Sequence, residues 1–158
     1  MSFDGFVTHA IALELNEKLS GARVEKIYQP ERDEIIISFR ANGSVLRLLL
    51  CANPSSPRIH LTEQKTENPP TAPLFCMILR KHLQGGKLIS AVQNHFDRVI
   101  MLKIESYTEL GDLTVKTLVI EIMGRHSNII LLSEKNIIID SIRHVDLTVS
   151  SVRQILPG

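Results

Sequence analysis

The sequence has few aromatic side chains: only 4% of its 158 residues are Phe, Trp or Tyr, and Trp is absent. A base-stacking platform of the usual aromatic kind is therefore not expected. The chain also lacks an excess of charge of either sign, because 18 Lys and Arg residues nearly balance 17 Asp and Glu residues, for a net charge of +1. The chain as a whole has no bulk attraction to nucleic acid or to an anionic membrane, so any nucleic-acid contact must come from a local patch.

Cysteine is scarce, and the two cysteines, Cys51 and Cys76, both lie in apolar runs. Two thiols without a signal peptide or a disulfide framework predict a reduced, cytoplasmic protein. The longest apolar runs are far short of the roughly 18–20 residues that span a bilayer, so no membrane partner is expected. Hydrophobic residues still make up 44% of the chain, which is enough for a core and excludes wholesale disorder.

The motifs of common enzyme classes are absent as well. The sequence contains no Gly-rich phosphate loop, no GxGxxG, no HExxH and no GxSxG elbow. Its six histidines are scattered, and no Cys/His pair has the spacing of metal ligands. These absences argue against an ordinary hydrolase, kinase or metalloenzyme, and neither a cofactor nor a metal is expected.

Two segments have the pattern of helices. Apolar residues recur every four positions from Phe3 to Leu19, and Ser20-Gly21 can end that helix in the left-handed conformation. The apolar side of this helix is expected to include Phe3, Phe6, Val7, Ala10, Ile11, Leu13, Leu15 and Leu19. Pro73 is expected as the first residue of a second helix, which Gly85-Gly86 ends.

The rest of the chain is typical of short strands and turns. Asn42-Gly43 between apolar runs predicts a tight hairpin, because both turn positions require positive φ. The expected strands are 22–28, 34–39, 44–51, 58–62, 87–93, 98–106, 114–123, 128–133 and 137–142. Residues 1–158 are therefore expected to form a single α+β domain, an antiparallel β-sandwich or barrel with about two flanking helices.

Polar residues interrupt the expected strands at Asp97-Arg98, just before an apolar run. Arg offers a planar fork of donors for a phosphate or a base edge, and a neighbouring Asp can orient it or accept a hydrogen bond from a base amine. The alternative is an ordinary solvated turn, since Asp is common in turns. Residue chemistry alone leaves both interpretations open.

A second polar interruption follows Glu121-Ile122-Met123. The strand breaks at Gly124, and the consecutive side chains of Arg125, His126, Ser127 and Asn128 can all donate hydrogen bonds to an RNA backbone or loop. The alternative is a polar loop around a glycine of positive φ. Glu121 is either an outward-facing strand residue or a buried partner of Arg125.

Charged residues at the two helices have structural explanations of their own. Asp4 lies in the first turn of the first helix, where a carboxylate stabilises the positive end of the dipole by about 0.3–1 kcal/mol. Arg80, Lys81 and His82, together with Lys87, could form a basic patch. Their place in the last turn of the second helix already accounts for them, because cations are favoured there.

At these clusters the chain resembles a known family. The matching sequence segments are Met1-Ser2-Phe3-Asp4-Gly5, Val24–Pro30, Asn68-Pro69, Phe75–Gly86 (FCMILRKHLQGG), Asp97-Arg98, Glu121–Asn128 (EIMGRHSN) and Leu156-Pro157-Gly158. They are similar to the NFACT-N domain of the RqcH, NEMF and fibronectin-binding protein A family, which includes bacterial ribosome quality control factors. The resemblance runs over essentially the whole chain, which is then expected to be the N-terminal fragment of a longer multidomain protein.

The resemblance implies a function in translation. Family members bind the stalled large (50S) ribosomal subunit that carries peptidyl-tRNA and recruit alanyl-tRNA. The nascent chain then receives a template-independent C-terminal alanine tail that marks it for degradation. Peptide-bond formation belongs to the ribosome, so the resemblance does not predict an enzyme.

The resemblance also implies which residues contact tRNA. The functional Asp-Arg pair of the family falls on Asp97 and Arg98, and its Glu-Ile-Met motif falls on Glu121, Ile122 and Met123. An N-terminal aspartate of the eukaryotic relatives aligns with Asp4. We expect Arg98 to donate to tRNA and Ile122 and Met123 to shape the strand end, while Arg125 and His126 reach phosphate.

The family's domain is similar in fold to the N-terminal domain of formamidopyrimidine-DNA glycosylases. Those enzymes use an N-terminal proline nucleophile, whereas this chain begins Met1-Ser2-Phe3, so glycosylase chemistry is not expected. The older family name leaves one alternative function, a surface adhesin that binds fibronectin or fibrinogen.

Overall fold

The computed structural model describes residues 4–63, 68–94 and 97–144, and it confirms the α+β class. Its helices are α1 (Gly5–Leu19), α2 (Leu74–Leu83) and a short 3-10 turn, η1 (Gly124–His126). Its strands are β1 (Arg23–Tyr28), β2 (Glu34–Ala41), β3 (Ser44–Cys51), β4 (Arg58–Thr62), β5 (Lys87–Gln93), β6 (Val99–Tyr107), β7 (Leu113–Glu121), β8 (Asn128–Leu132) and β9 (Ile138–Ser141).

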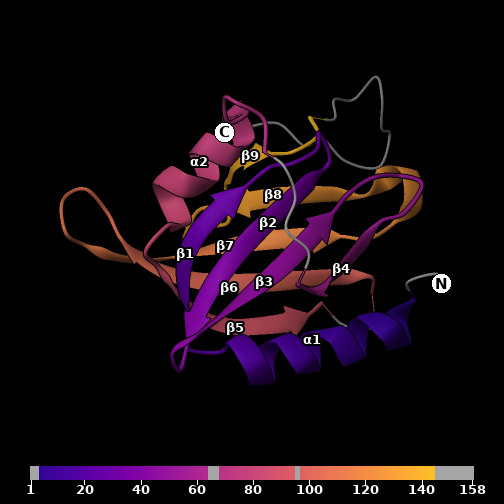
Figure 1. Cartoon of the computed structure of the whole chain (residues 1–158), viewed down its shortest axis with the longest axis horizontal. Coiled ribbons are helices and arrows are strands. Elements are labelled where there is room, and N and C mark those ends of the chain that lie inside the picture. The colour runs from indigo at the N-terminus through magenta and orange to yellow at the C-terminus, as the bar shows by residue number, and fades with distance from the viewer. Residues whose placement is uncertain (1–3, 64–67, 95–96, 145–158) are drawn as a thin grey trace.

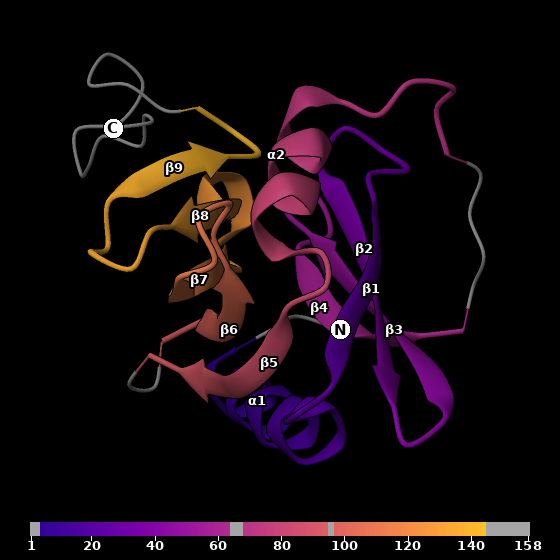
Figure 2. The ribbon, with the colours of Figure 1, turned by 90° about the vertical axis from the view of Figure 1, so that its left-hand side faces the viewer.

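All nine strands belong to one antiparallel sheet in the order β4-β3-β2-β1-β5-β6-β7-β8-β9. The pairing of β1 with β5 is a single register pair, Arg23 with Lys87, and the sheet folds over at this narrow junction. Its halves, β1–β4 and β5–β9, face each other as layers (Figures 1 and 2). Within the described residues β4 and β9 remain its two ends, so the arrangement is a sandwich rather than a closed barrel.

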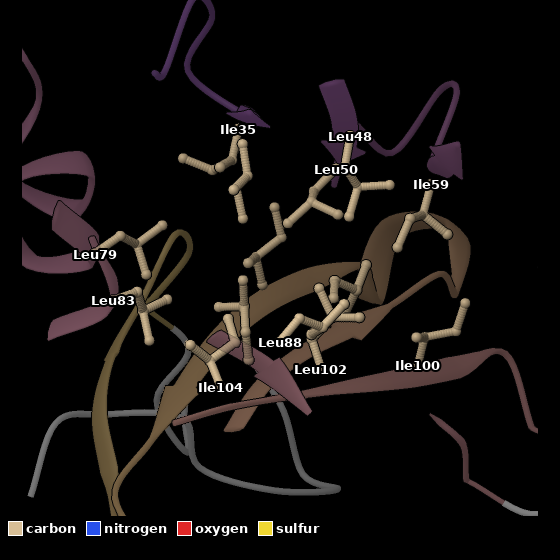
Figure 3. Packing of buried hydrophobic residues seen from close by; sticks show 14 of the residues in the cluster. Ile35, Leu48, Leu50, Ile59, Leu79, Leu83, Leu88, Ile100, Leu102 and Ile104 are labelled. Atoms are coloured by element: carbon tan, nitrogen blue, oxygen red, sulfur yellow. The ribbon is translucent and has the colours of Figure 1, made fainter. Parts of the chain in front are cut away.

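The main core fills the space between these layers. Ile35, Leu48, Leu50 and Ile59 point from β2, β3 and β4 toward Leu88, Ile100, Leu102 and Ile104 of the opposite half (Figure 3). Leu79 and Leu83 of α2 close this core at one side, where the helix contacts β1, β6 and β9. All ten of these side chains are 0% exposed, so the hydrophobic effect holds the halves together. Main-chain hydrogen bonds at the β1–β5 junction, such as that from the Val24 amide to the Gly86 carbonyl at 2.8 Å, add to it.

Helix α1 begins at Gly5, so Asp4 is its N-cap and not a residue of its first turn as predicted. The Asp4 side chain accepts a hydrogen bond from the Val7 amide at 2.9 Å. This capping bond satisfies one of the free N–H groups of the first turn. The helix packs on β5 through a narrower face than the sequence predicts, since Phe6 is 82% and Leu13 59% exposed. The spacing of apolar residues along a helix does not determine how many of them the neighbouring strand covers. Phe3 lies outside the described residues.

Helix α2 begins one residue later than predicted, because Pro73 is its N-cap, with φ −61° and extended ψ, and Leu74 is its first residue. The helix buries Phe75, Cys76, Leu79 and Leu83. None of the described helices has the length and apolarity that crossing a membrane requires.

The predicted turn chemistry is confirmed where positive φ is needed. Asn42 and Gly43 have φ of +51° and +79° and join β2 to β3. Gly21, with φ of +85°, follows the end of α1.

Candidate functional site

Asp97 and Arg98 form an exposed turn between β5 and β6 whose main chain is held on both sides. The Asp97 amide donates to the Asn94 carbonyl at 3.1 Å, and the Ile122 amide donates to the Arg98 carbonyl at 2.8 Å. Both side chains extend from this fixed backbone toward solvent, and no ion pair joins them among the described residues. The pair is therefore available to a partner.

Gln93 connects this turn to the start of α1. Its side-chain amide donates to the Asp97 carbonyl at 2.8 Å and to the Gly5 carbonyl at 2.9 Å, and its oxygen lies 3.1 Å from His9 Nδ1. Asp4 and Asp97 are thus brought to the same end of the sandwich, although they are 93 positions apart. The sequence contained no signal for Gln93, because a glutamine at the end of a strand is unremarkable until its partners are known.

The end of β7 lies directly beside Arg98. Glu121 pairs with Val99, and the chain then turns so that Ile122 bonds to the Arg98 carbonyl. This adjacency brings together the Asp97-Arg98 turn and the Glu-Ile-Met segment, which the sequence singled out separately.

The side chains of this segment are less accessible than the prediction of a tRNA contact requires. Ile122 is 1% exposed and belongs to the main core, so it does not offer its side chain to tRNA. Glu121 lies on the opposite face and is only 4% exposed, and Met123 packs against the small outer cluster of Val99, Val119 and Ile130. Neighbouring residues of a strand face opposite sides of a sheet, so Glu121 and Ile122 are buried on different faces. These residues shape the strand end.

The η1 loop carries two exposed polar side chains of the site, Arg125 and His126. Gly124 has φ of +55°, and the buried Ser127 hydroxyl accepts from the Met123 amide at 2.9 Å. This closed turn directs Arg125 and His126 to solvent. Both are therefore placed to reach a phosphate, and they are contiguous with the segment that borders Arg98.

Arg143 ties this loop to the other half of the sandwich, and sequence reasoning missed it. Its guanidinium donates to the Arg125 carbonyl at 3.0 Å, and to Asp33 Oδ1 and the Ala52 carbonyl at 3.4 Å. Its main chain bonds to the Asn128 side chain through both the amide and the carbonyl. These partners lie between 15 and 110 positions away, so no local pattern could reveal them.

Replacing Arg143 by alanine is expected to lower the free energy of unfolding by about 2 kcal/mol, because hydrogen bonds to a charged group contribute about 1.5–3 kcal/mol. Urea denaturation measures the difference. Arg32→Ala is the matched control, since Arg32 is exposed and its loss should stay within about 0.5 kcal/mol. Equal stability of the two variants would reject Arg143 as the tie between the halves.

The described residues offer no group of three or more His, Cys, Asp or Glu side chains that could hold a metal ion. Cys51 and Cys76 are buried and free, and burial is the main cause that raises the pKa of each thiol. Neither thiol is therefore activated as a nucleophile at neutral pH.

Comparison with known proteins identifies relatives over nearly the whole chain. A family model described as NFACT N-terminal and middle domains matches residues 4–158. The Rqc2 homolog RqcH of Bacillus subtilis is 48% identical over 159 aligned residues, which cover 100% of this chain and 28% of the relative. The ribosome quality control complex subunit NEMF of Homo sapiens is 31% identical over 85% of this chain and 12% of its own length. The chain thus spans less than a third of these relatives.

Solved structures show the same fold. The N-terminal domain of fibronectin-binding protein PavA from Streptococcus pneumoniae superposes with a TM-score of 0.95 at 42% identity, over 99% of this chain and 60% of that one. A fibrinogen binding protein from Staphylococcus aureus superposes with a TM-score of 0.89 at 36% identity, over 100% of this chain and 55% of that one. At sequence identities of 42% and 36%, these two proteins resemble this chain in sequence as well as in fold.

Proposed function

Because this chain belongs to the family of NFACT N-terminal and middle domains, we propose that it acts in ribosome quality control as a tRNA-binding domain. The factor binds the stalled large (50S) subunit that carries peptidyl-tRNA and recruits alanyl-tRNA. The ribosome forms the peptide bonds of the alanine tail, and the domain itself is not an enzyme. The proposal places the protein in the cytoplasm.

The observation that carries the proposal is the meeting of the Asp97-Arg98 turn with the end of β7 at one end of the sandwich. Arg98 is exposed on a backbone that the Ile122 amide fixes at 2.8 Å. The exposed guanidinium that extends from this fixed backbone can donate two parallel hydrogen bonds to a phosphate or a base edge of tRNA in the anticodon region. Asp97 accepts from a base amine beside it.

The residues around this pair divide into contacts and supports. Arg125 and His126 supply donors to the RNA backbone, since both are exposed on the adjoining loop. Glu121, which pairs with Val99, and Met123, whose amide donates to the Ser127 hydroxyl, support the strand end beside the pair. Asp4 caps the helix that Gln93 connects to the turn. A net charge of +1 adds little long-range attraction, so we expect modest affinity with a shallow salt dependence.

The double substitution Asp97→Ala with Arg98→Ala tests this proposal. It is expected to weaken binding of alanyl-tRNA to this chain at least tenfold, because each good bidentate contact is worth about 1–3 kcal/mol. Fluorescence anisotropy with labelled tRNA measures the affinity. Alanine tailing in a reconstituted reaction with the full-length factor should fall in parallel.

Glu31→Ala with Arg32→Ala is the control, because it removes an adjacent exposed acidic and basic pair in the turn between β1 and β2. Its tRNA affinity is expected to stay within twofold of wild type. If the Asp97-Arg98 variant is folded and still binds and tails as the control does, the assignment is wrong.

The names of the solved relatives favour one alternative, an adhesin for fibronectin or fibrinogen. Surface plasmon resonance at high salt, after nuclease treatment, distinguishes the functions. Tight binding to immobilised fibronectin together with no affinity for tRNA would favour the adhesin.

A further inference from the structure

A second group of cationic side chains lies at the far end of the β6–β7 ribbon from Arg98. Here the last turn of α2 meets the ribbon, whose tip extends away from the sandwich (Figure 1). A cleft of about 330 Å³ at this place is lined by Lys81, His82, Tyr107, Thr108, Glu109 and Lys116, among others. Strand β6 runs from Val99, beside Arg98, to Tyr107 at the cleft. These eight residue steps correspond to roughly 26 Å at 3.3 Å per residue.

The basic side chains of this cleft, Lys81, His82 and Lys116, lie close enough to disfavour one another's charged forms, and Glu109 is the acidic residue of the lining. Burial lowers the pKa of His82, and the charges of Lys116 and Lys81 lower it further. Burial also lowers the pKa of Lys116, and Glu134 only partly opposes that effect. None of the ion pairs within 4.0 Å among the described residues involves these three side chains. An anion placed between them would relieve this repulsion.

Arg80 does not share this arrangement, although it is adjacent in the sequence. Its Nε donates to the Ile27 carbonyl at 2.8 Å, and its guanidinium lies 5.9 Å from the centre of the Tyr28 ring. Arg80 therefore faces β1 and is already occupied. The three basic residues at the end of α2 therefore have different surroundings. Arg80 holds the helix on the sheet, whereas Lys81 and His82 line the cleft.

We propose that this cleft binds a backbone phosphate of RNA, with Lys81 and Lys116 as its charged contacts and Tyr107 as a stacking surface for the adjacent base. Tyr107 is 74% exposed beside the cations, and the Thr108 hydroxyl supplies a further polar group. Cations next to an exposed ring suit single-stranded or looped RNA, which is bound through phosphate and base stacking together. The choice of RNA over an acidic protein rests on the proposed function.

His82 gives a direct test in the unmodified protein. Bound phosphate should stabilise its protonated form, so the pKa of His82 is expected to rise when inorganic phosphate or unfractionated tRNA is added. Proton NMR of the ring measures this pKa from pH 5 to 8. His126 is exposed on η1, so its ring signals in the same spectra report binding near the Asp97-Arg98 turn. A pKa of His82 that neither probe changes would overturn the proposal.

The variant Lys81→Gln with Lys116→Gln tests the contacts by affinity. It is expected to bind unfractionated tRNA about tenfold more weakly, and the slope of log affinity against log salt should fall by about one to two. The control is Lys26→Gln with Lys103→Gln, which removes the same charge from exposed strand positions and should change affinity less than twofold. Equal tRNA affinity of these two variants would overturn the proposal.

Two further outcomes distinguish binding at this cleft from binding at the Asp97-Arg98 turn, and RNA from an acidic protein as the ligand of the cleft. If Asp97→Ala with Arg98→Ala loses tRNA affinity while the cleft variant does not, the proposed function stands and the cleft assignment fails. The reverse result supports the cleft and rejects the first site. A poly-glutamate peptide that raises the pKa of His82 where tRNA does not would assign the cleft to an acidic protein and overturn the RNA proposal.

Discussion

Replacing Gly86 by alanine is expected to lower the free energy of unfolding by about 3 kcal/mol. A Cβ at this position would lie 2.8 Å from the Glu105 carbonyl oxygen, 2.9 Å from the Leu83 carbonyl oxygen and 2.9 Å from Ile104 Cγ2. Two of these neighbours are backbone atoms, which can move only if α2 and β6 separate. Overpacking of this kind costs about 1–3 kcal/mol, and rigid neighbours place Gly86 at the upper end.

The adjacent Gly85 provides the control. It has φ of +84°, and a Cβ there would meet no atom within 4 Å, so Gly85→Ala adds conformational strain without a clash. The expected cost is about 1–2 kcal/mol. Urea denaturation of both variants gives the comparison. If Gly85→Ala is the more damaging of the two, close packing of α2 against the sheet is not what requires glycine at position 86.

Ile120→Ala is expected to lower the free energy of unfolding by about 3–4 kcal/mol. Ile120 lies on β7, is 0% exposed and belongs to the main core between the two halves of the sheet. Its truncation leaves a cavity that neighbours from both layers cannot fill without moving toward each other. Buried Ile→Ala changes cost about 2–5 kcal/mol for this reason.

Ile130→Ala removes the same atoms from the other face of the sheet. Ile130 is 6% exposed and belongs to the small outer cluster with Val99 and Val119, so we expect a loss of about 1.5–2 kcal/mol. Equilibrium unfolding by circular dichroism measures both variants. Equal losses would mean that the outer cluster is packed as tightly as the sandwich core, contrary to the structure.

Local patterns predicted the elements well, because each depends on residues close together in the chain. Asn42-Gly43 tolerates positive φ, and Gly21 does so after α1, so the turn and the helix end appeared where they were predicted. Errors of one or two residues occurred where ends are set by pairing. Strand β6 starts at Val99, because Arg98 belongs to the turn that Asn94 and Ile122 hold.

The candidate site was predictable in part. The sequence picked out the Asp97-Arg98 turn and the segment after Glu121, and the antiparallel pairing of β6 with β7 made them neighbours. The sequence left the burial of Glu121 open, because alternation assigns a residue to a face but not what covers that face. The contacts of Gln93 and Arg143 were out of reach, since their partners are close only after folding.

By itself the sequence determined the α+β composition, the turns and the polar breaks at the ends of β6 and β7, because backbone preference and hydrophobic period act over a few residues. Tertiary structure alone decided that the sheet folds at the β1–β5 junction, that Phe6 faces solvent and that His82 meets Lys116. Those outcomes depend on which distant surfaces exclude water from one another, and burial of that kind exists only in the assembled molecule.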